Sequence, residues 1–177
     1  MTEPSTLIRH ERSRFRGTDE WFVVVRQPEL VAIRVFATAE RIVDCWHALT
    51  LHLDPAVDVH IHDLRSSRRW SGGLLALPDV REAMGRLRLP LAAYGGVELS
   101  LFTDSDQLTL TPEMLLVIYA RTDRWTYLLD GLGLLERPDM AVPVWLPTRD
   151  LLRPDTQLAH VLHAAADRLG LTEETAL

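Results

Sequence analysis

The pattern of apolar and polar positions predicts a β-hairpin near the start of the chain. Residues 21–26 read WFVVVR, a β-branched and aromatic run that is typical of a buried strand. A second run, LVAIRVFA, covers residues 30–37. Only Gln27, Pro28 and Glu29 separate the two runs, and a connection this short favours an antiparallel pair.

A helix, a strand and another helix follow in the pattern. Thr38 is a good N-cap for a helix that runs to about residue 53, because its hydroxyl can accept a backbone N–H of the first turn. The apolar stripe of this helix recurs every three or four residues, at Ile42, Trp46, Leu49 and Leu53. Residues 57–64 then alternate as a half-buried strand does. Pro78 suits the first turn of the next helix, where its missing N–H costs nothing.

Residues 89–120 predict a meander of antiparallel strands. Gly95-Gly96 can supply the positive φ angles of a tight hairpin turn. Residues 104–106, Asp-Ser-Asp, provide a second turn, because short polar side chains satisfy the local backbone groups. Residues 115–120, LLVIYA, are apolar on both sides, which predicts a strand in the centre of the sheet.

The last third of the chain predicts two helices with a strand between them. Asp123 opens a helix that should end early, because Gly131 and Gly133 each cost about 1 kcal/mol of helix propensity relative to alanine. Residues 141–147, AVPVWLP, are flanked by proline and predict an edge strand. A final helix is expected over residues 155–170, with an aspartate at its start and a glycine at its end.

These elements together predict an α+β fold. We expect a single layered domain over residues 1–177, with a mainly antiparallel sheet of about six strands and helices packed on it. Strands and helices do not alternate strictly, which argues against a doubly wound parallel sheet. Residues 1–18 are polar and mixed in charge, and are expected to form an N-terminal arm or edge segment.

Length and composition indicate a globular domain with its own core. The chain has 177 residues, of which 47% are hydrophobic, enough to bury a core without disulfides or metal. No apolar run approaches the roughly 18 to 20 residues of a membrane-spanning helix, and no secretory signal is visible. The single cysteine, Cys45, cannot form an intrachain disulfide and is expected to be a small buried hydrophobe. We therefore expect a cytoplasmic protein that does not enter a membrane.

The charge balance argues against general nucleic-acid binding. The formal net charge is −6, whereas phosphate recognition needs a basic face. All 19 residues counted as lysine or arginine are arginine, and asparagine is absent as well. Both missing residue types use A-rich codons, so this composition is typical of a GC-rich bacterial genome.

Residues 57–63, VDVHIHD, carry the clearest candidate chemistry. Alternate residues of a strand share a face, so Asp58, His60 and His62 point to one side and the aliphatic residues to the other. Paired imidazoles at this spacing are metal ligands in cupins and carbonic anhydrases, where the metal activates water. Candidate third ligands lie on the helix before this strand, which carries His47, His52 and Cys45, and on the last helix, which carries His160 and His163. The alternative is a solvated or hydrogen-bonded polar strand face.

The Asp-x-His-x-His spacing of Asp58, His60 and His62 resembles the first-strand motif of amidohydrolases. The resemblance implies a TIM-like barrel that carries out metal-dependent hydrolysis. Such a barrel typically takes about 250 residues, with strands and helices in alternation. This chain is shorter, lacks the alternation and matches over residues 57–63 only, so we do not assign it to the family. A metal site on a different fold stays open.

Residues 65–73, RSSRRWSGG, read as a polar loop that places Arg65, Arg68 and Arg69 beside Trp70. An exposed tryptophan flanked by arginine is typical of a binding hot spot. The alternative is that Trp70 packs back onto the edge of the sheet.

Neither a nucleophile elbow, a phosphate loop nor a dinucleotide fingerprint occurs in the sequence. The leading hypothesis is therefore a non-catalytic protein-binding or assembly domain without a cofactor, which recognises another protein or itself through the Arg/Trp segment. The alternative is a metal-binding protein or small metal-dependent hydrolase that holds a divalent metal on the Asp58/His60/His62 strand face. An antitoxin-like or immunity-like inhibitor is a third option that the small size and acidic charge permit.

Overall fold

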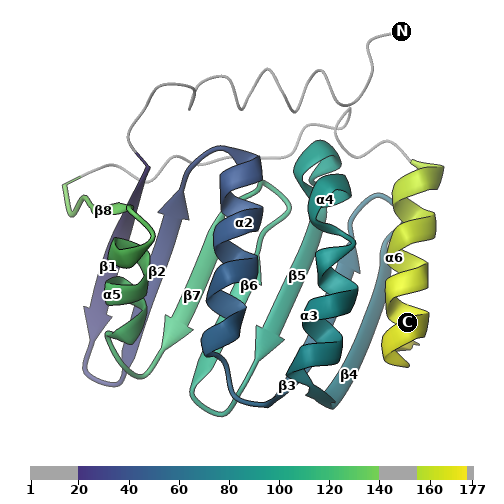
Figure 1. Cartoon of the computed structure of the whole chain (residues 1–177), viewed down its shortest axis with the longest axis horizontal. Helices are drawn as coiled ribbons and strands as arrows, with labels where there is room; N and C mark the ends of the chain where they lie inside the picture. The colour runs from purple at the N-terminus through teal and green to yellow at the C-terminus, as the bar shows by residue number, and fades with distance from the viewer. Residues whose placement is uncertain (1–19, 140–154, 175–177) are drawn as a thin grey trace, which may run out of the picture.

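The computed structural model describes residues 20–139 and 155–174 (Figure 1). Its centre is one nine-stranded sheet in the order β8-β1-β2-β7-β6-β5-β3-β4-β9. Neighbouring strands pair antiparallel, except β1 and β8, which pair parallel. The strands are β1 Trp21–Gln27, β2 Leu30–Phe36, β3 Ala56–Asp63, β4 Arg68–Ala76, β5 Val97–Phe102, β6 Asp106–Leu110, β7 Leu116–Ala120, β8 Leu135–Glu136 and β9 Thr172–Glu174.

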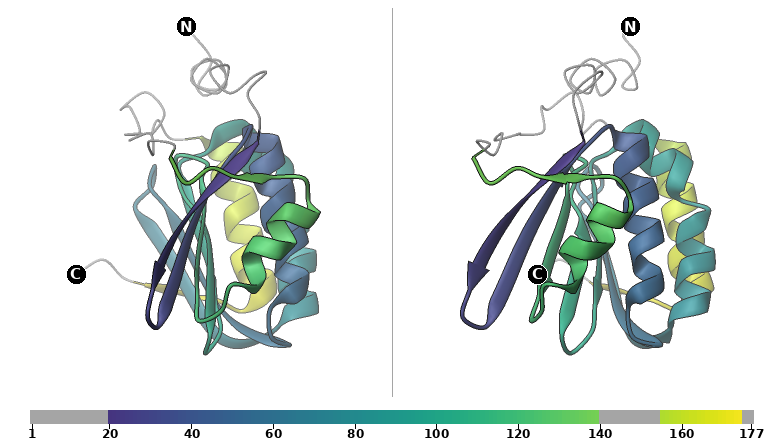
Figure 2. Two further views of the ribbon diagram at one scale, coloured as in Figure 1. Left: turned by 90° about the vertical axis from the view of Figure 1, so that its left-hand side faces the viewer. Right: turned by 60° about the vertical axis from the view of Figure 1, so that its left-hand side comes forward.

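The five α-helices of the described residues lie together on one face of the sheet (Figure 2). They are α2 Ala39–Leu49, α3 Leu77–Gly85, α4 Arg88–Tyr94, α5 Arg124–Gly131 and α6 Thr156–Leu169. A 3-10 turn, Thr50–His52, extends α2. The expected α+β architecture, a mostly antiparallel sheet with helices packed on it, is confirmed. None of the helices in residues 20–139 and 155–174 has the length and apolar character needed to cross a lipid bilayer.

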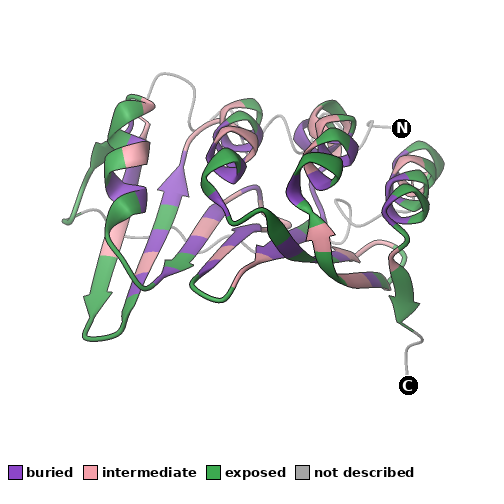
Figure 3. Ribbon diagram, turned by 60° about the horizontal axis from the view of Figure 1, so that its bottom comes forward, coloured by how far each residue is buried: buried purple, intermediate pink, exposed green. Residues whose placement is uncertain are grey.

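The core lies between the helices and the face of the sheet that they cover. Buried and more exposed positions alternate along the strands (Figure 3), because successive side chains point to opposite faces. One row of register partners on the covered face is fully buried, and it consists of Ile33, Ile118, Leu108, Leu101 and Val59. Each such side chain stabilises the fold by roughly 1.5 to 3 kcal/mol when it leaves water.

Several local predictions hold because they depend on neighbours in the sequence. The Thr38 hydroxyl accepts a hydrogen bond from the Arg41 backbone N–H at 3.4 Å, so this residue caps α2 as expected. Asp155 caps α6 in the same way, accepting from the Leu158 N–H at 2.7 Å. Gly170 ends that helix in the left-handed conformation, with φ of 63°. Asp123 precedes α5, which ends early, as the glycines predicted, although its carboxylate forms no side-chain cap.

Other predictions were wrong. The expected loop over residues 65–73 is largely strand β4, because its residues find pairing partners on both β3 and β9. The expected meander begins late, since Arg88–Tyr94 forms α4, and Gly95-Gly96 joins this helix to β5 instead of closing a hairpin. The number of strands is nine where about six were expected. The N-terminal arm over residues 1–18 and the edge strand over residues 141–147 lie outside the described residues.

The strand β7 is central, as predicted, but it is not covered on both sides. It lies between β2 and β6, and Leu116 and Ile118 are fully buried under the helices. Val117 and Tyr119 point to the other side and keep contact with solvent. We call the side of the sheet that faces away from the five helices the open face.

Candidate functional site

The open face is organised in rows that cross the sheet from strand to strand. The central row follows register partners over eight strands, and its members are Val23, Arg34, Val117, Thr109, Ser100, His60, Ser71 and Thr172. The row changes character in the middle of the sheet. Its first three members are apolar apart from one arginine, and its last five carry hydroxyl or imidazole groups.

The half of the open face over β1, β2 and β7 is mainly apolar. We call this the apolar strip, and it consists of Val23, Val25, Ala32, Val117 and Tyr119. Two of its side chains are well exposed, Val25 at 53% and Tyr119 at 37%. Exposed apolar side chains that are contiguous, and not scattered singly, are typical of a surface that binds a partner.

Arg34 stands in the middle of the apolar strip. Its register partners are Val23 on β1 and Val117 on β7, and its side chain is exposed. Within the part of the chain that the structure describes, its guanidinium forms neither a hydrogen bond nor an ion pair. A free guanidinium surrounded by apolar groups can anchor a partner that brings a carboxylate.

The other half of the open face is polar and contains a pocket of about 300 Å³. Residues from β3, β4, β5 and β9 line it: His60, Ile61, His62, Arg69, Trp70, Glu98 and Glu174. One row of register partners, Glu98–His62–Arg69–Glu174, crosses this pocket with acids at both ends. The His60 ring lies against Phe102, with ring centroids 4.9 Å apart.

Among the residues that line this pocket, His62 has a shifted pKa. Burial lowers its pKa from the ordinary value of 6.5, and the neighbouring guanidinium of Arg69 lowers it further. Glu98 acts in the opposite direction, but less strongly. The imidazole is therefore held in its neutral form near pH 7, as a donor and acceptor of hydrogen bonds.

The structure places Asp58, His60 and His62 on one face of β3, as the alternation predicted, but gives them different surroundings. Asp58 accepts the backbone N–H of Leu74 at 2.8 Å across a bulge between β3 and β4, so it has a structural role. Across residues 20–139 and 155–174, no three histidine, cysteine, aspartate or glutamate side chains are arranged to hold a metal ion. The metal hypothesis stays a prediction that only the two imidazoles on this strand support.

The proposed third ligands do not join this group. His47 lies 3.4 Å from the carbonyl oxygen of Arg81 in the helix layer, and His160 lines a groove of about 230 Å³ between α3 and α6. Cys45 is buried as expected, and desolvation raises the pKa of its thiol to about 11. A thiol with this pKa carries almost no thiolate at pH 7, so Cys45 is not an activated nucleophile.

The four residues of the Arg/Trp segment do not share one exposed surface, although the Arg68 guanidinium lies over the Trp70 ring, 4.8 Å from its centroid. Trp70 is 3% exposed and belongs to the core, so the alternative that it packs onto the sheet is the one observed. Arg65 turns away and donates to the carbonyl oxygens of Tyr94, at 2.7 Å, and Gly95, where it satisfies the end of α4. Arg69 is exposed on the polar half of the open face, whereas Arg65 and Arg68 are partly buried.

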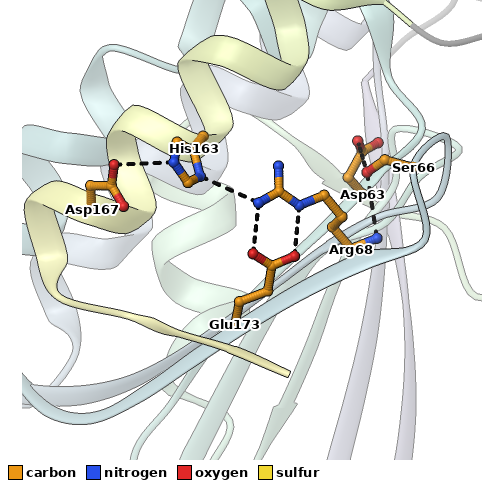
Figure 4. A network of polar contacts seen from close by, with 6 residues as sticks. All are labelled: Asp63, Ser66, Arg68, His163, Asp167 and Glu173. Atoms are coloured by element: carbon orange, nitrogen blue, oxygen red, sulfur yellow. Dashed lines mark hydrogen bonds and ion pairs between the residues drawn. The ribbon is translucent and has the colours of Figure 1, made fainter. Parts of the chain in front are cut away.

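Arg68 is the centre of a polar network that ties β4, α6 and β9 together (Figure 4). Its guanidinium donates two hydrogen bonds to Glu173, at 2.7 and 2.6 Å, and lies 3.5 Å from Nδ1 of His163. His163 in turn lies 3.3 Å from a carboxylate oxygen of Asp167. This network positions the C-terminal helix and strand.

Sequence reasoning missed the apolar strip. Its members belong to apolar runs that predicted strands. For one of these strands the prediction was burial on both faces, and for the others it did not say which face is buried. The signal that marks an uncovered face is the presence of Arg34 and Tyr119 within these runs, because a central strand buried on both faces has no place for a guanidinium.

Comparison of the chain with family models, with curated proteins and with solved structures found no match in any of the three.

Proposed function

We propose that this chain is a non-catalytic, cytoplasmic protein-binding or assembly domain, and that the open face is its binding surface. The observation that carries the proposal is the apolar strip on a sheet whose opposite face is covered by helices. Val25 and Tyr119 expose apolar area there on rigid strands, and this area gains free energy when a partner removes it from water.

The arrangement of the open face supports binding of another polypeptide over turnover of a small molecule. An apolar strip next to a polar half is the composition of a protein interface, in which apolar contacts give affinity and polar contacts give specificity. Tyr119 and Arg34 are of the residue types that dominate binding energy at such interfaces.

Site-specific photo-crosslinking tests the proposal. A photoreactive phenylalanine analogue replaces Tyr119 in one variant and Tyr127 in a matched control, since Tyr127 is an exposed tyrosine on α5 in the helix layer. We expect irradiation in cells to link position 119, and not position 127, to a polypeptide, either a second copy or another protein. Equal or absent adducts at both positions would contradict the proposal.

A further inference from the structure

One edge of the sheet is only partly covered. Strand β8 pairs with the first two residues of β1 and leaves residues 23–27 without a neighbouring strand on that side, in the part of the chain that the structure describes (Figure 1, Figure 2). The opposite edge is better protected, because β9 pairs with residues 69–71 of β4 and the Leu171 side chain lies against the next residue, Gly72. We call residues 23–27 of β1 the free edge.

The backbone groups of Val24 and Arg26 point out of the free edge. The carbonyl oxygens of Glu20 and Phe22 accept hydrogen bonds from residues at β8, at 3.1 and 2.9 Å, and alternate residues of a strand direct their N–H and C=O groups to the same side. Val24 and Arg26 continue this series, and within residues 20–139 and 155–174 their outward groups have no hydrogen-bond partner. The free edge thus offers two donors and two acceptors in a row, the pattern that an added strand completes.

The side chains beside the free edge indicate what kind of strand fits it. On the open face Val25 is 53% exposed, and Arg34, the register partner of Val23, is exposed and unpaired in the described residues. An added strand lies about 4.8 Å from β1 and about 10 Å from β2, a distance that an arginine and a glutamate side chain span together. The free edge therefore favours a segment with an apolar residue opposite Val25 and a carboxylate opposite Val23, since the covered guanidinium needs an acidic partner.

A second copy of β1 does not fit the free edge. A two-fold axis centred on Arg26 places two arginines directly opposite each other, and like charges at opposed positions destabilise a sheet. An axis centred on Val24 or Val25 brings β1 or the hairpin turn of one copy into the place that β8 occupies beside Phe22 in the other. The free edge therefore fits a strand other than β1.

We propose that an extended segment of another polypeptide adds to the free edge as an antiparallel strand, with its backbone bonded to Val24 and Arg26 and a carboxylate on Arg34. This inference rests on the proposed function and assigns its partner as an extended segment, and not a folded surface. Antiparallel pairing lets Val24 and Arg26 each exchange both N–H···O bonds with one residue of the segment. The backbone bonds give affinity, and the side chains at alternate positions give specificity.

Selection from a displayed library of random twelve-residue peptides tests this assignment. We expect peptides enriched on the wild-type protein to carry an acidic residue two positions away from an apolar one. A bound peptide should slow hydrogen exchange at the amides of Val24 and Arg26 by about tenfold or more, because both become hydrogen-bonded. The amide of Val25 is the control within the same strand, since it already faces β2 and should not change.

Variants of the free edge separate the backbone from the side chains. Val24→Pro removes the outward N–H but leaves the bonds between β1 and β2, and proline is tolerated at a strand edge. We expect it to weaken peptide binding at least about tenfold, whereas Val24→Ala keeps the N–H and should change binding less than about threefold. Arg34→Gln should weaken binding about fivefold or more and abolish the preference for an acidic residue. Thermal melts check that the variants fold, and the exchange pattern of the wild type is decisive without them.

The outcomes that would overturn the added strand are specific. They are the absence of any enriched peptide, or enriched peptides that leave exchange at Val24 and Arg26 unchanged. Slowed exchange at the same two amides with rising protein concentration, and without peptide, would show that a second copy occupies the free edge instead. The failure of the proposed function is distinguishable, because it shows as absent polypeptide adducts at position 119.

Discussion

The indole N–H of Trp125 donates a hydrogen bond of 2.7 Å to the carboxylate of Asp106, which is 6% exposed. This contact joins α5 to the start of β6 beneath the helix layer. The second carboxylate oxygen accepts from the Arg124 guanidinium at 2.6 Å, so both oxygens of the buried acid are paired. Asp106 therefore fixes the helix that follows β7, although the sequence indicated only a turn residue there.

Replacing Asp106 with alanine should lower the free energy of unfolding by about 1 to 3 kcal/mol, because the Trp125 N–H is left buried without an acceptor. Urea denaturation followed by tryptophan fluorescence measures the change. Asp104→Ala is the matched control, since Asp104 is exposed in the same turn and should cost less than about 0.5 kcal/mol. Equal losses in the two variants would show that the buried contact contributes nothing specific.

The Arg68–Glu173 pair should make the attachment of β9 sensitive to acid. Hydrogen bonds from the Arg68 guanidinium lower the pKa of Glu173 below its ordinary value of 4.5. The contribution of Glu173 to stability is therefore complete above pH 4.5 and is lost as the pH falls through the lowered pKa. We expect Glu173→Gln to lower the melting temperature slightly at pH 7 and to have no effect near pH 2. A difference of the same size at both pH values would contradict this.

Two partly buried histidines should destabilise the fold in mild acid. Burial lowers the pKa of His47 and of His62 below 6.5, so the unfolded chain takes up protons at a higher pH than the folded one. Their contribution to stability is complete above pH 6.5 and is lost as the pH falls through their folded-state pKa values.

Imidazoles titrate between roughly pH 7.5 and pH 5. Denaturation midpoints measured over this range should therefore fall with decreasing pH. The double variant His47→Gln/His62→Gln should show a flatter profile. His52→Gln serves as the control, because His52 is exposed in the 3-10 turn after α2. A profile of the double variant as steep as that of the wild type would assign the pH dependence to other groups.

Leu74 is held in a conformation that leucine rarely adopts. It lies in β4 with φ of 54° and is 85% exposed, so it contributes little to the core. Asparagine tolerates this region better, and we expect Leu74→Asn to stabilise the protein by about 0.5 to 1 kcal/mol. Leu74→Val should destabilise it, because a β-branched side chain fits a positive φ poorly. Thermal denaturation ranks the three proteins, and the reverse order would refute the backbone argument.

Cys45 should react with thiol reagents only after unfolding. Its side chain is buried in α2, and desolvation raises its pKa to about 11. At pH 8 the native protein should therefore react with a chromogenic disulfide reagent at least 100-fold more slowly than the protein in urea, where the ordinary thiol pKa near 8.5 applies. Rapid labelling of the folded protein would indicate that the helix opens locally.

The candidate site shows where sequence reasoning fails and why. The alternation in β3 correctly placed His60 and His62 on one face, since side-chain direction in a strand depends only on neighbouring residues. The Arg/Trp segment was misinterpreted because its arginines looked like surface residues. Arg65 and Arg68 instead have partners 29 or more residues away, at Tyr94 and Glu173. Such partners are not visible in a local pattern.

The sequence by itself determined the local elements of this protein. Thr38 and Asp155 begin helices, Gly170 ends one, and the apolar periods select strand or helix, because caps and periodicity are short-range properties. Only the tertiary structure decided the strand order, the burial of Trp70, and the face of the sheet that the helices leave uncovered. Those features depend on which distant segments pack together, and long-range packing overrides what each segment favours alone.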